Sequence, residues 1–369
     1  MPGIWHQACC CGVSGGSLLL VRGKANYPYD LVLYSWSGMD WTSEILIPGY
    51  VPSPSNRDAT VTHEGDPSNV IIFTFPSGDD FRLVWGQRPP IGEDFWGYIE
   101  IEAGAVYGRP MASMQDQNGS PRVIYHDFAA NKTYLLKYQS AGAYWWTRHL
   151  LHSGSEALGN ISAKPDGSGT VWAGLYQYAV DSKCYLCDEF NNVYETPVLY
   201  WPLCSVTVDT NGTPYLTLCH RGSAAAPKYS TIVYKLSGGA LVKVSDVLIE
   251  DADQYGWVGI IDQNNRYWIL YENDADNVLK ACYATVGEWV WTHEVVDILD
   301  PLAQPTVQAA KLSMSENAPI AAVRWQGNWL EPSHVYRRLS KRWEKLPATE
   351  SEDQLDYYVV DLSAPLSPW

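Results

Sequence analysis

An aromatic or large apolar residue recurs about every fifty positions along this chain of 369 residues. In "NVLKACYATVGEWVWTHEVVD", a turn at Gly287-Glu288 precedes an expected aromatic strand on which Trp289 and Trp291 alternate. Equivalent anchors follow one another at spacings of 48 to 55 residues. A unit of this length that repeats along a whole chain constrains the fold more than any single motif does. The seven anchors are Trp41, Trp96, Trp146, Tyr194, Val242, Trp291 and Trp343.

A second repeated feature is a turn pair between two apolar runs. Asn211-Gly212 in "SVTVDTNGTPYLTLCH" shows it most clearly, because Asn-Gly favours a tight hairpin turn. The other pairs are Gly15-Gly16, Asp66-Pro67, Asn118-Gly119, Asp166-Gly167, Asn264-Asn265 and Glu316-Asn317. Each unit therefore reads as four strands, and no helical period interrupts the series. The pattern predicts an all-β chain folded as a seven-bladed β-propeller of four-stranded antiparallel blades, with the recurring Trp packed between blades.

We expect one propeller domain over residues 1–350, followed by a C-terminal tail over residues 351–369. The tail contains one strand-like run, Asp356 to Leu362, which either closes the first blade or docks on a neighbouring subunit. The blades are expected at 4–52, 57–106, 109–155, 157–200, 203–250, 254–300 and 304–349.

The formal net charge of −16 restricts the possible partners. A polyanion such as DNA or RNA would be repelled over most of this surface, so we expect no nucleic-acid partner. The chain contains no run of eighteen apolar residues, so we expect no membrane insertion. Its N-terminus lacks the basic start and apolar core of a secretory signal, and synthesis in the cytoplasm is the expectation.

The eight cysteines do not form a recognisable metal-binding pattern. Cys184 and Cys187 look like a CxxC motif, but on the expected strand they point to opposite faces, roughly 10 Å apart. That separation opposes a shared zinc ion and a mutual disulfide. We expect the cysteines to be small buried apolar residues, with inter-subunit disulfides as the alternative for Cys9, Cys10 and Cys11.

The stretch "YENDADN" suggests a cation site, because Asp274 and Asp276 alternate. An EF-hand is excluded, since its sixth and twelfth positions are occupied here by Leu279 and Thr285 instead of Gly and Glu. A looser cation site at the two aspartates stays open. We expect no cofactor.

The half-blade "VLKACYATVGEWVWTHEVVD" and the stretch "DQNGSPRVIYHDFAANKTYLLKYQSAGAYWW" resemble the sialidase-like (BNR-type) repeat propellers of bacterial and phage proteins. The resemblance implies a propeller fold over most of the chain. The Asp-box of true sialidases, Ser-x-Asp-x-Gly-x-Thr-Trp, is absent, and "SAKPDGSGTVW" is a loose echo of it.

Binding residues are expected in the loops between the second and third strands of the blades, which vary more than the strands do. Their aromatic side chains offer flat apolar surface, and their charged side chains offer polar contacts. The candidate ligand-binding residues are Arg22, Tyr27, Tyr29, His126, Asp127, Tyr176, Tyr178, Arg221, Trp325 and Trp329.

Catalytic signatures such as GxSxG and HExxH are missing. His149 and His152 are three residues apart, so we expect them to diverge on a strand. The sequence therefore favours a non-catalytic interaction or assembly module, not an enzyme, for instance a phage virion or tail component that binds a receptor. A protein partner or a second copy of the chain is then expected, with a cell-surface glycan as a further partner. The alternatives are a carbohydrate-binding lectin and a sialidase-like glycoside hydrolase.

Overall fold

The computed structural model describes most of the strands and part of the turns between them. The described residues are 10–12, 18–24, 31–36, 40–47, 59–64, 66–74, 83–87, 97–102, 108–116, 120–127, 130–138, 146–154, 158–166, 168–177, 181–221, 229–247, 254–273, 278–298, 306–315, 318–326, 334–346 and 355–358. Every regular element in these ranges is a β-strand, which confirms the all-β prediction.

The described strands pair into seven antiparallel sheets, which we number in chain order. The first contains β1 (Cys10–Gly12), β2 (Leu18–Lys24), β3 (Leu31–Trp36), β4 (Trp41–Ile47) and β30 (Leu355–Tyr358). The second contains β5 (Ala59–Glu64), β6 (Asp66–Thr74), β7 (Leu83–Gln87) and β8 (Gly97–Glu102). The third contains β9 (Gly108–Gln115), β10 (Pro121–Asp127), β11 (Lys132–Tyr138) and β12 (Trp146–Ser153). The fourth contains β13 (Leu158–Pro165), β14 (Val171–Gln177), β16 (Cys184–Asp188) and β17 (Val193–Glu195).

The remaining three sheets complete the chain. The fifth contains β15 (Asp181–Ser182), β18 (Leu199–Val208), β19 (Pro214–Arg221), β20 (Tyr229–Ser237) and β21 (Ala240–Val247). The sixth contains β22 (Gln254–Ile261), β23 (Arg266–Asn273), β24 (Val278–Thr285) and β25 (Thr292–Ile298). The seventh contains β26 (Thr306–Ser315), β27 (Ala318–Gln326), β28 (His334–Leu339) and β29 (Arg342–Lys345).

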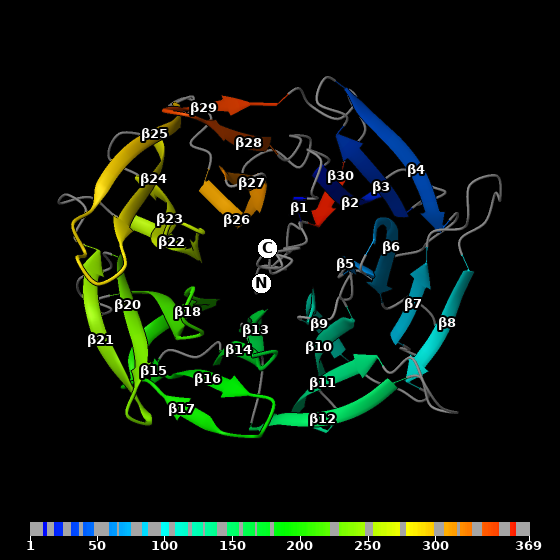
Figure 1. The fold of residues 1–369 in the computed structure, drawn as a ribbon, viewed down its shortest axis with the longest axis horizontal. Helices are drawn as coiled ribbons and strands as arrows, with labels where there is room; N and C mark the ends of the chain where they lie inside the picture. The colour runs from blue at the N-terminus through cyan, green and yellow to red at the C-terminus, as the bar shows by residue number, and fades with distance from the viewer. Residues whose placement is uncertain are drawn as a thin grey trace.

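The sheets stand in a ring around one central axis, as Figure 1 shows. In the five sheets that contain four strands, the first strand in the chain lies nearest the axis and the last lies on the outside, and in the first sheet β1 and β30 lie on the inner side and β4 on the outside. A sheet in this ring has a neighbour against each face, so both faces can be buried. Tyr267 and Trp268, consecutive on β23, point to opposite faces, and each is 0% exposed. This explains why the middle strands read as nearly continuous apolar runs.

The two ends of the described chain meet in the first sheet. On the edge of β2 opposite β3, β1 pairs with residues 18–20, and β30 pairs with residues 21–24. The inner side of this sheet is therefore assembled from both ends of the described chain, since β30, which follows the seventh sheet in sequence, pairs with β2 of the first.

Four hairpins share a buried aspartate: β9–β10, β13–β14, β18–β19 and β22–β23. The backbone N–H of this aspartate donates to the carbonyl four residues later, and its Oδ1 accepts the N–H of that same later residue. Its Oδ2 accepts a hydrogen bond from the side chain six residues later. The aspartates are Asp116, Asp166, Asp209 and Asp262, and the side chains six residues later are those of Arg122, Trp172, Tyr215 and Trp268.

This hairpin gives the predicted turn pairs a physical basis. Asn211-Gly212 lies in a described turn, and Gly212 has φ of 78°, a conformation that glycine adopts without strain. The carboxylate of Asp209 satisfies the N–H groups of Asn211 and Thr213, which the turn leaves outside the strand ladder. The buried aspartate therefore fixes the turn and anchors an aromatic side chain in the sheet.

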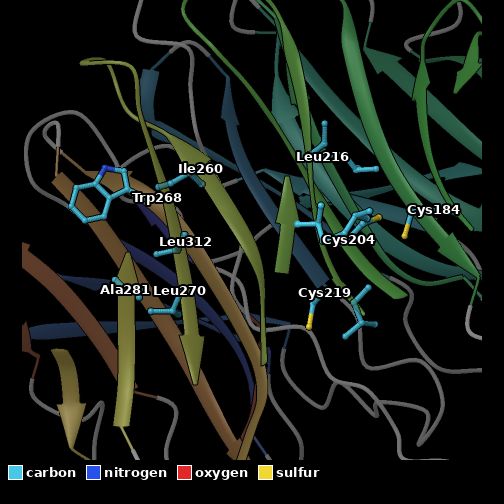
Figure 2. Close-up of a cluster of buried hydrophobic side chains, with 14 of the residues drawn as sticks. Cys184, Cys204, Leu216, Cys219, Ile260, Trp268, Leu270, Ala281 and Leu312 are labelled. Atoms are coloured by element: carbon cyan, nitrogen blue, oxygen red, sulfur yellow. The ribbon is translucent and has the colours of Figure 1, made fainter. Parts of the chain in front are cut away.

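The apolar core lies between the sheets. One cluster joins the fourth to seventh sheets, and Figure 2 shows its members Leu216, Ile260, Trp268 and Leu312 projecting from different strands. Aromatic anchors of the sequence repeat contribute to these junctions. Trp343 of the seventh sheet lies 6.5 Å from Trp268 of the sixth, measured between ring centroids, and packs against this cluster.

Two tryptophans of the sixth unit lie elsewhere than expected. The strand β25 begins at Thr292, so Trp289 and Trp291 belong to the turn before it and do not alternate on a strand. The turn is longer than the sequence suggested because Gly287 and Trp289 both have positive φ, 97° and 55°. The indole N–H of Trp291 donates to Ser245 of the fifth sheet at 3.0 Å, so this residue still joins adjacent sheets.

Gly259 on β22 is enclosed by the fifth sheet, and we expect Gly259→Ala to destabilise the fold. An added Cβ would lie 2.2 Å from Oγ1 of Thr217 and 2.9 Å from a ring carbon of Tyr267. Thr217 and Tyr267 are buried and share a hydrogen bond of 2.6 Å, so neither can retreat easily. Overpacking of this kind costs about 1–3 kcal/mol of the free energy of unfolding, which urea denaturation would measure.

Gly174→Ala is the matched control for this prediction. Its added Cβ would lie 3.0 Å from the terminal methyl group of Leu216, which can rotate away more readily. We therefore expect a smaller loss than for Gly259→Ala. Equal losses for the two variants would show that close packing at Gly259 is not the reason for its glycine.

Candidate functional site

Polar side chains gather where the third sheet faces the fourth. His126 pairs with Thr133 across β10 and β11, and Thr133 pairs with His152 across β11 and β12. Directly paired residues of an antiparallel sheet share a face, so the three side chains form one row. Ile124, which precedes His126 by two positions on that face, packs in a cluster with Val171 and Leu175 of the fourth sheet. The row therefore faces the fourth sheet.

A register shift in β12 brings His152 into this row. His149 pairs with Leu135 and His152 pairs with Thr133, and the shift lies between Thr133 and Tyr134. Because Leu135 and Thr133 are two positions apart on one strand, both histidines share a face. The expectation that His149 and His152 diverge is therefore wrong, since a β-bulge adds one residue between them.

His126 is held in a buried position. It is 1% exposed, and its Nδ1 shares a hydrogen bond of 3.1 Å with Oγ1 of Thr133. The pKa of His126 is lowered to about 4, mainly by burial; the charge of Asp127 opposes the shift, and the nearby His152 adds to it. The imidazole of His126 is therefore neutral at physiological pH.

The fourth sheet supplies Tyr185 to the same place. Its ring lies 4.7 Å from the imidazole of His152 between centroids, with the two planes inclined by 33°. Gly154 leaves room for this imidazole, because a Cβ at that position would lie 2.6 Å from Nε2 of His152. His152 and Tyr185 are both partly exposed, in contrast to His126.

Two charged residues stand next to Tyr185. Glu195 is its direct cross-strand partner on β17, and Lys183 precedes it by two positions and forms an ion pair with Glu195. Burial lowers the pKa of His152, and Glu195 opposes that shift. Burial, with a contribution from Glu195, raises the pKa of Tyr185. At neutral pH the pair therefore consists of a neutral imidazole that can accept a proton and a phenol that can donate one.

The third sheet carries a local positive charge that the whole chain lacks. Residues 109–155 contain five basic residues and only two acidic ones, although the chain as a whole has a net charge of −16. Three of the eight histidines also lie in this segment. The basic residues are Arg109, Arg122, Lys132, Lys137 and Arg148, and the acidic ones are Asp116 and Asp127.

The candidate binding residues from the sequence do not all lie at this site. His126 belongs to it, and Asp127 follows it at the end of β10, where its Oδ1 accepts the N–H of Ala130. Tyr176 is 3% exposed and belongs to the core cluster, because β14 extends beyond the expected loop start. Arg22, Arg221 and Trp325 lie within strands β2, β19 and β27, where only their backbone is described. Tyr27, Tyr29, Tyr178, Trp329, Asp274 and Asp276 lie outside the described residues.

The described residues contain no group of three or more His, Cys, Asp or Glu side chains arranged to hold a metal ion. Cys184 and Cys187 contribute to two different core clusters, which confirms that they point to opposite faces. Both are buried free thiols, as are Cys204, Cys219 and Cys282. Within the same ranges, none of the chain forms a helix with the length and apolar character needed to cross a membrane.

Sequence reasoning missed His152, Tyr185 and Thr133 as site residues. The histidine was considered, but its direction depends on a bulge that no local pattern in "TRHLLHSG" signals. Tyr185 comes from the next unit of the repeat, so its contact with His152 depends on how two sheets pack. The excess of basic residues in 109–155 was the one signal in the sequence that could have directed attention here.

The fold and this site place the chain among the β-propeller-type structures. No protein-family model and no curated protein sequence matches it. Among solved structures, an ulvan lyase of polysaccharide lyase family PL25, bound to -[GlcA(1-4)Rha3S]-, matches with 11% identity and a TM-score of 0.64. The match covers 94% of this chain and 97% of that chain.

Peptidases and a hydrolase share the fold over only part of their length. A puromycin hydrolase matches with 9% identity and a TM-score of 0.60, over 94% of this chain and 54% of that chain. A prolyl endopeptidase matches with 13% identity and a TM-score of 0.54, over 96% of this chain and 50% of that chain. At such identities these matches establish a propeller-like fold, as the repeat predicted, and no sialidase-repeat family is shown.

These neighbours correct the expected class of function. The prediction of a non-catalytic interaction or assembly module, and of a chain that is not an enzyme, is contradicted by the ulvan lyase, the puromycin hydrolase and the prolyl endopeptidase, which match along the chain and are enzymes. Missing short motifs are a weak argument against catalysis, because catalytic groups can come from segments that are far apart in the sequence. Nothing in the comparisons supports a phage, virion or receptor-binding assignment, and lectin and sialidase-like activities are likewise not supported.

Proposed function

We propose that this chain is a polysaccharide lyase that acts on a uronate-containing polysaccharide. The observation that carries the proposal is the contact between His152 and Tyr185, a neutral imidazole against a phenol at a junction of two sheets. The ulvan lyase supports it, because that enzyme matches this chain along nearly its whole length, whereas the peptidases match over about half of theirs.

The proposed reaction is a β-elimination. His152 removes the proton from the carbon next to the uronate carboxylate, and the electron pair of that C–H bond forms a carbon–carbon double bond. The bond to the glycosidic oxygen on the adjacent carbon breaks, and Tyr185 donates its proton to that oxygen. The products are an unsaturated uronate end and a new free hydroxyl, with no water consumed. A general base next to a general acid suits this reaction, because elimination requires one proton to be removed and another to be donated.

The local charge of the third sheet fits an anionic substrate. A uronate polymer would be repelled by the chain's overall charge, but residues 109–155 contain five basic and two acidic residues, with Arg122 ion-paired to Asp116 and Lys137 to Glu189. His126 stays neutral, so it adds no charge beside His152 that would hinder proton uptake there. These features support binding of the polymer across the junction of the third and fourth sheets.

We further propose that the ring is a seven-bladed β-propeller whose blades follow the predicted order, with Asp181–Ser182 and Leu199–Tyr200 in the fifth blade instead of the fourth. Seven described sheets of four or five strands around one axis support this. The pairing of β30 with β2 supports assigning residues 355–358 to the first blade.

Incubation with uronate-containing polysaccharides tests the proposed activity. Ulvan and other uronate polymers should yield products that absorb in the ultraviolet through the new double bond, together with new reducing ends, whereas neutral dextran should yield neither. Reducing ends without ultraviolet absorbance would indicate hydrolysis and contradict elimination. Absence of both signals from a chain with an intact β circular-dichroism spectrum would contradict the proposed substrate class.

A further inference from the structure

The negative charge of Glu195 acts on both groups of the proposed proton transfer, His152 and Tyr185. It is directly opposite Tyr185 in the β16–β17 ladder, and the ring of Tyr185 is 4.7 Å from that of His152. Glu195 is also ion-paired with Lys183, which lies on the same side of the fourth sheet as Tyr185. Four titratable side chains therefore form one group at the junction of the third and fourth sheets.

We propose that Glu195 is a positioning residue for the His152–Tyr185 pair, and that Lys183 holds its carboxylate in place and moderates its charge. The inference rests on the proposed elimination, in which His152 must be neutral and Tyr185 protonated. A negative charge favours the protonated form of each group, and a positive charge opposes it. Glu195 and Lys183 therefore act in opposite directions on the pH range of activity.

Charged and titratable residues surround the pair on β9, β10, β16 and β17, with Arg109 on β9 paired to His126 in the ladder. Glu195 on β17 opposes the burial-driven lowering of the pKa of His152 and adds to the raised pKa of Tyr185. Lys183 lowers the pKa of Tyr185, whereas Cys184 and Cys187 on β16 act in the raising direction. On β10, His126 is neutral, and Asp127 acts on His126.

The Lys183–Glu195 pair is solvent-exposed enough to be exchanged without unfolding the chain. Their side chains are 37% and 49% exposed, and surface ion pairs of this kind contribute little to stability. The apolar residues beneath them, such as Leu175 and Cys187, hold the two sheets together independently of this pair. The exposed pair therefore stands beside the proposed chemistry without being needed for packing.

The test compares Glu195→Gln and Lys183→Met in pH profiles of lyase activity. For Glu195→Gln, the acid and alkaline limbs of the profile should both move to lower pH. Without the negative charge, His152 stays neutral down to a lower pH, and Tyr185 loses its proton at a lower pH. For Lys183→Met, the alkaline limb should move to higher pH. At the optimum, kcat should stay within about threefold of wild type, since neither residue transfers a proton. Glu195→Asp should restore part of the wild-type profile.

Asp246→Asn is the matched control. Asp246 forms an exposed ion pair with Lys243 on the fifth sheet, at 2.8 Å, with side chains that are 44% and 49% exposed. This substitution removes the same charge from an equally exposed pair and should leave the profile unchanged. An Asp246→Asn profile that shifts as far as that of Glu195→Gln would overturn the proposal, because net charge alone would then account for the effect.

A second readout separates this inference from the proposed function. NMR titration of ¹³C-labelled histidines, with the His152 signal assigned through its loss in His152→Gln, follows the imidazole directly. Glu195→Gln should move the His152 midpoint to lower pH, even if no polysaccharide is cleaved. An unmoved midpoint would overturn the role of Glu195, whereas a moved midpoint without lyase activity would contradict only the proposed reaction.

Discussion

Asp262→Ala should lower the free energy of unfolding by about 3–5 kcal/mol, a large share of the stability of a folded domain. The Asp262 side chain is fully buried, and its Oδ1 accepts the backbone N–H groups of Asn264 and Arg266, each at 2.9 Å. Its Oδ2 accepts Nε of Arg266 at 2.7 Å and the indole N–H of Trp268 at 3.0 Å. Alanine leaves all these N–H groups without an acceptor, and the charged side chain of Arg266 loses its counter-ion.

Asp262→Asn should be nearly as damaging. The amide oxygen can replace one carboxylate oxygen, but the amide nitrogen is a donor and would face the donors that Oδ2 now accepts. The matched control is Asp246→Ala, which removes a carboxylate from an exposed ion pair and should cost less than about 1 kcal/mol.

Urea denaturation followed by tryptophan fluorescence and by circular dichroism would measure both variants. An Asp262→Asn protein as stable as wild type would contradict the view that the hairpin depends on a carboxylate. An Asp262→Ala loss no larger than that of Asp246→Ala would contradict the importance of the buried hairpin as a whole.

Tyr185→Phe should reduce kcat of the proposed elimination by about 10²–10⁴-fold, the range that general acid catalysis contributes. Phenylalanine keeps the ring against His152 and removes only the hydroxyl, so packing between the two sheets should be retained. His152→Gln should reduce kcat by a similar factor, because the amide cannot accept the proton. Initial rates of unsaturated uronate formation, with KM measured alongside, would test both variants.

His149→Gln is the control for the histidine substitution. His149 shares the strand and the face of His152, but it shares a hydrogen bond of 3.3 Å with Thr147 and lies in the field of Lys137 and Glu189. Its substitution should leave the rate within about twofold of wild type. Equal losses for His149→Gln and His152→Gln would place the chemistry elsewhere in the ring.

The repeat could be predicted from the sequence because each hairpin is encoded by residues that are close together in the chain. A turn pair such as Asn211-Gly212 and a fixed spacing between aromatic anchors are encoded within one unit, and they predicted the all-β architecture. The aspartate two residues before that turn was not recognised, although Asp209 is the residue that closes it. Its role becomes visible only when the side chain six residues later, Tyr215, is seen to share the same carboxylate.

The candidate site could be predicted from the sequence only in part. His126 was selected as part of the expected loop 126–133; it lies on β10 instead, where it belongs to the polar row. Tyr176 was selected by the same rule and is buried, because its strand continues further than the loop pattern implied. The direction of His152 depends on a bulge, and its partner Tyr185 comes from another sheet, so neither could follow from one-dimensional spacing.

The shared inner side of the first sheet has a consequence for the order in which the protein is made. Residues 18–36 leave the ribosome early, yet residues 21–24 find their partner in β30 only after nearly the whole chain has been synthesised. During translation the first sheet therefore keeps an unpaired backbone edge, which is a site for wrong pairing with other chains. Completion of the ring is expected to be the last folding step, and chaperone dependence should be greatest for nascent chains that stop before residue 355.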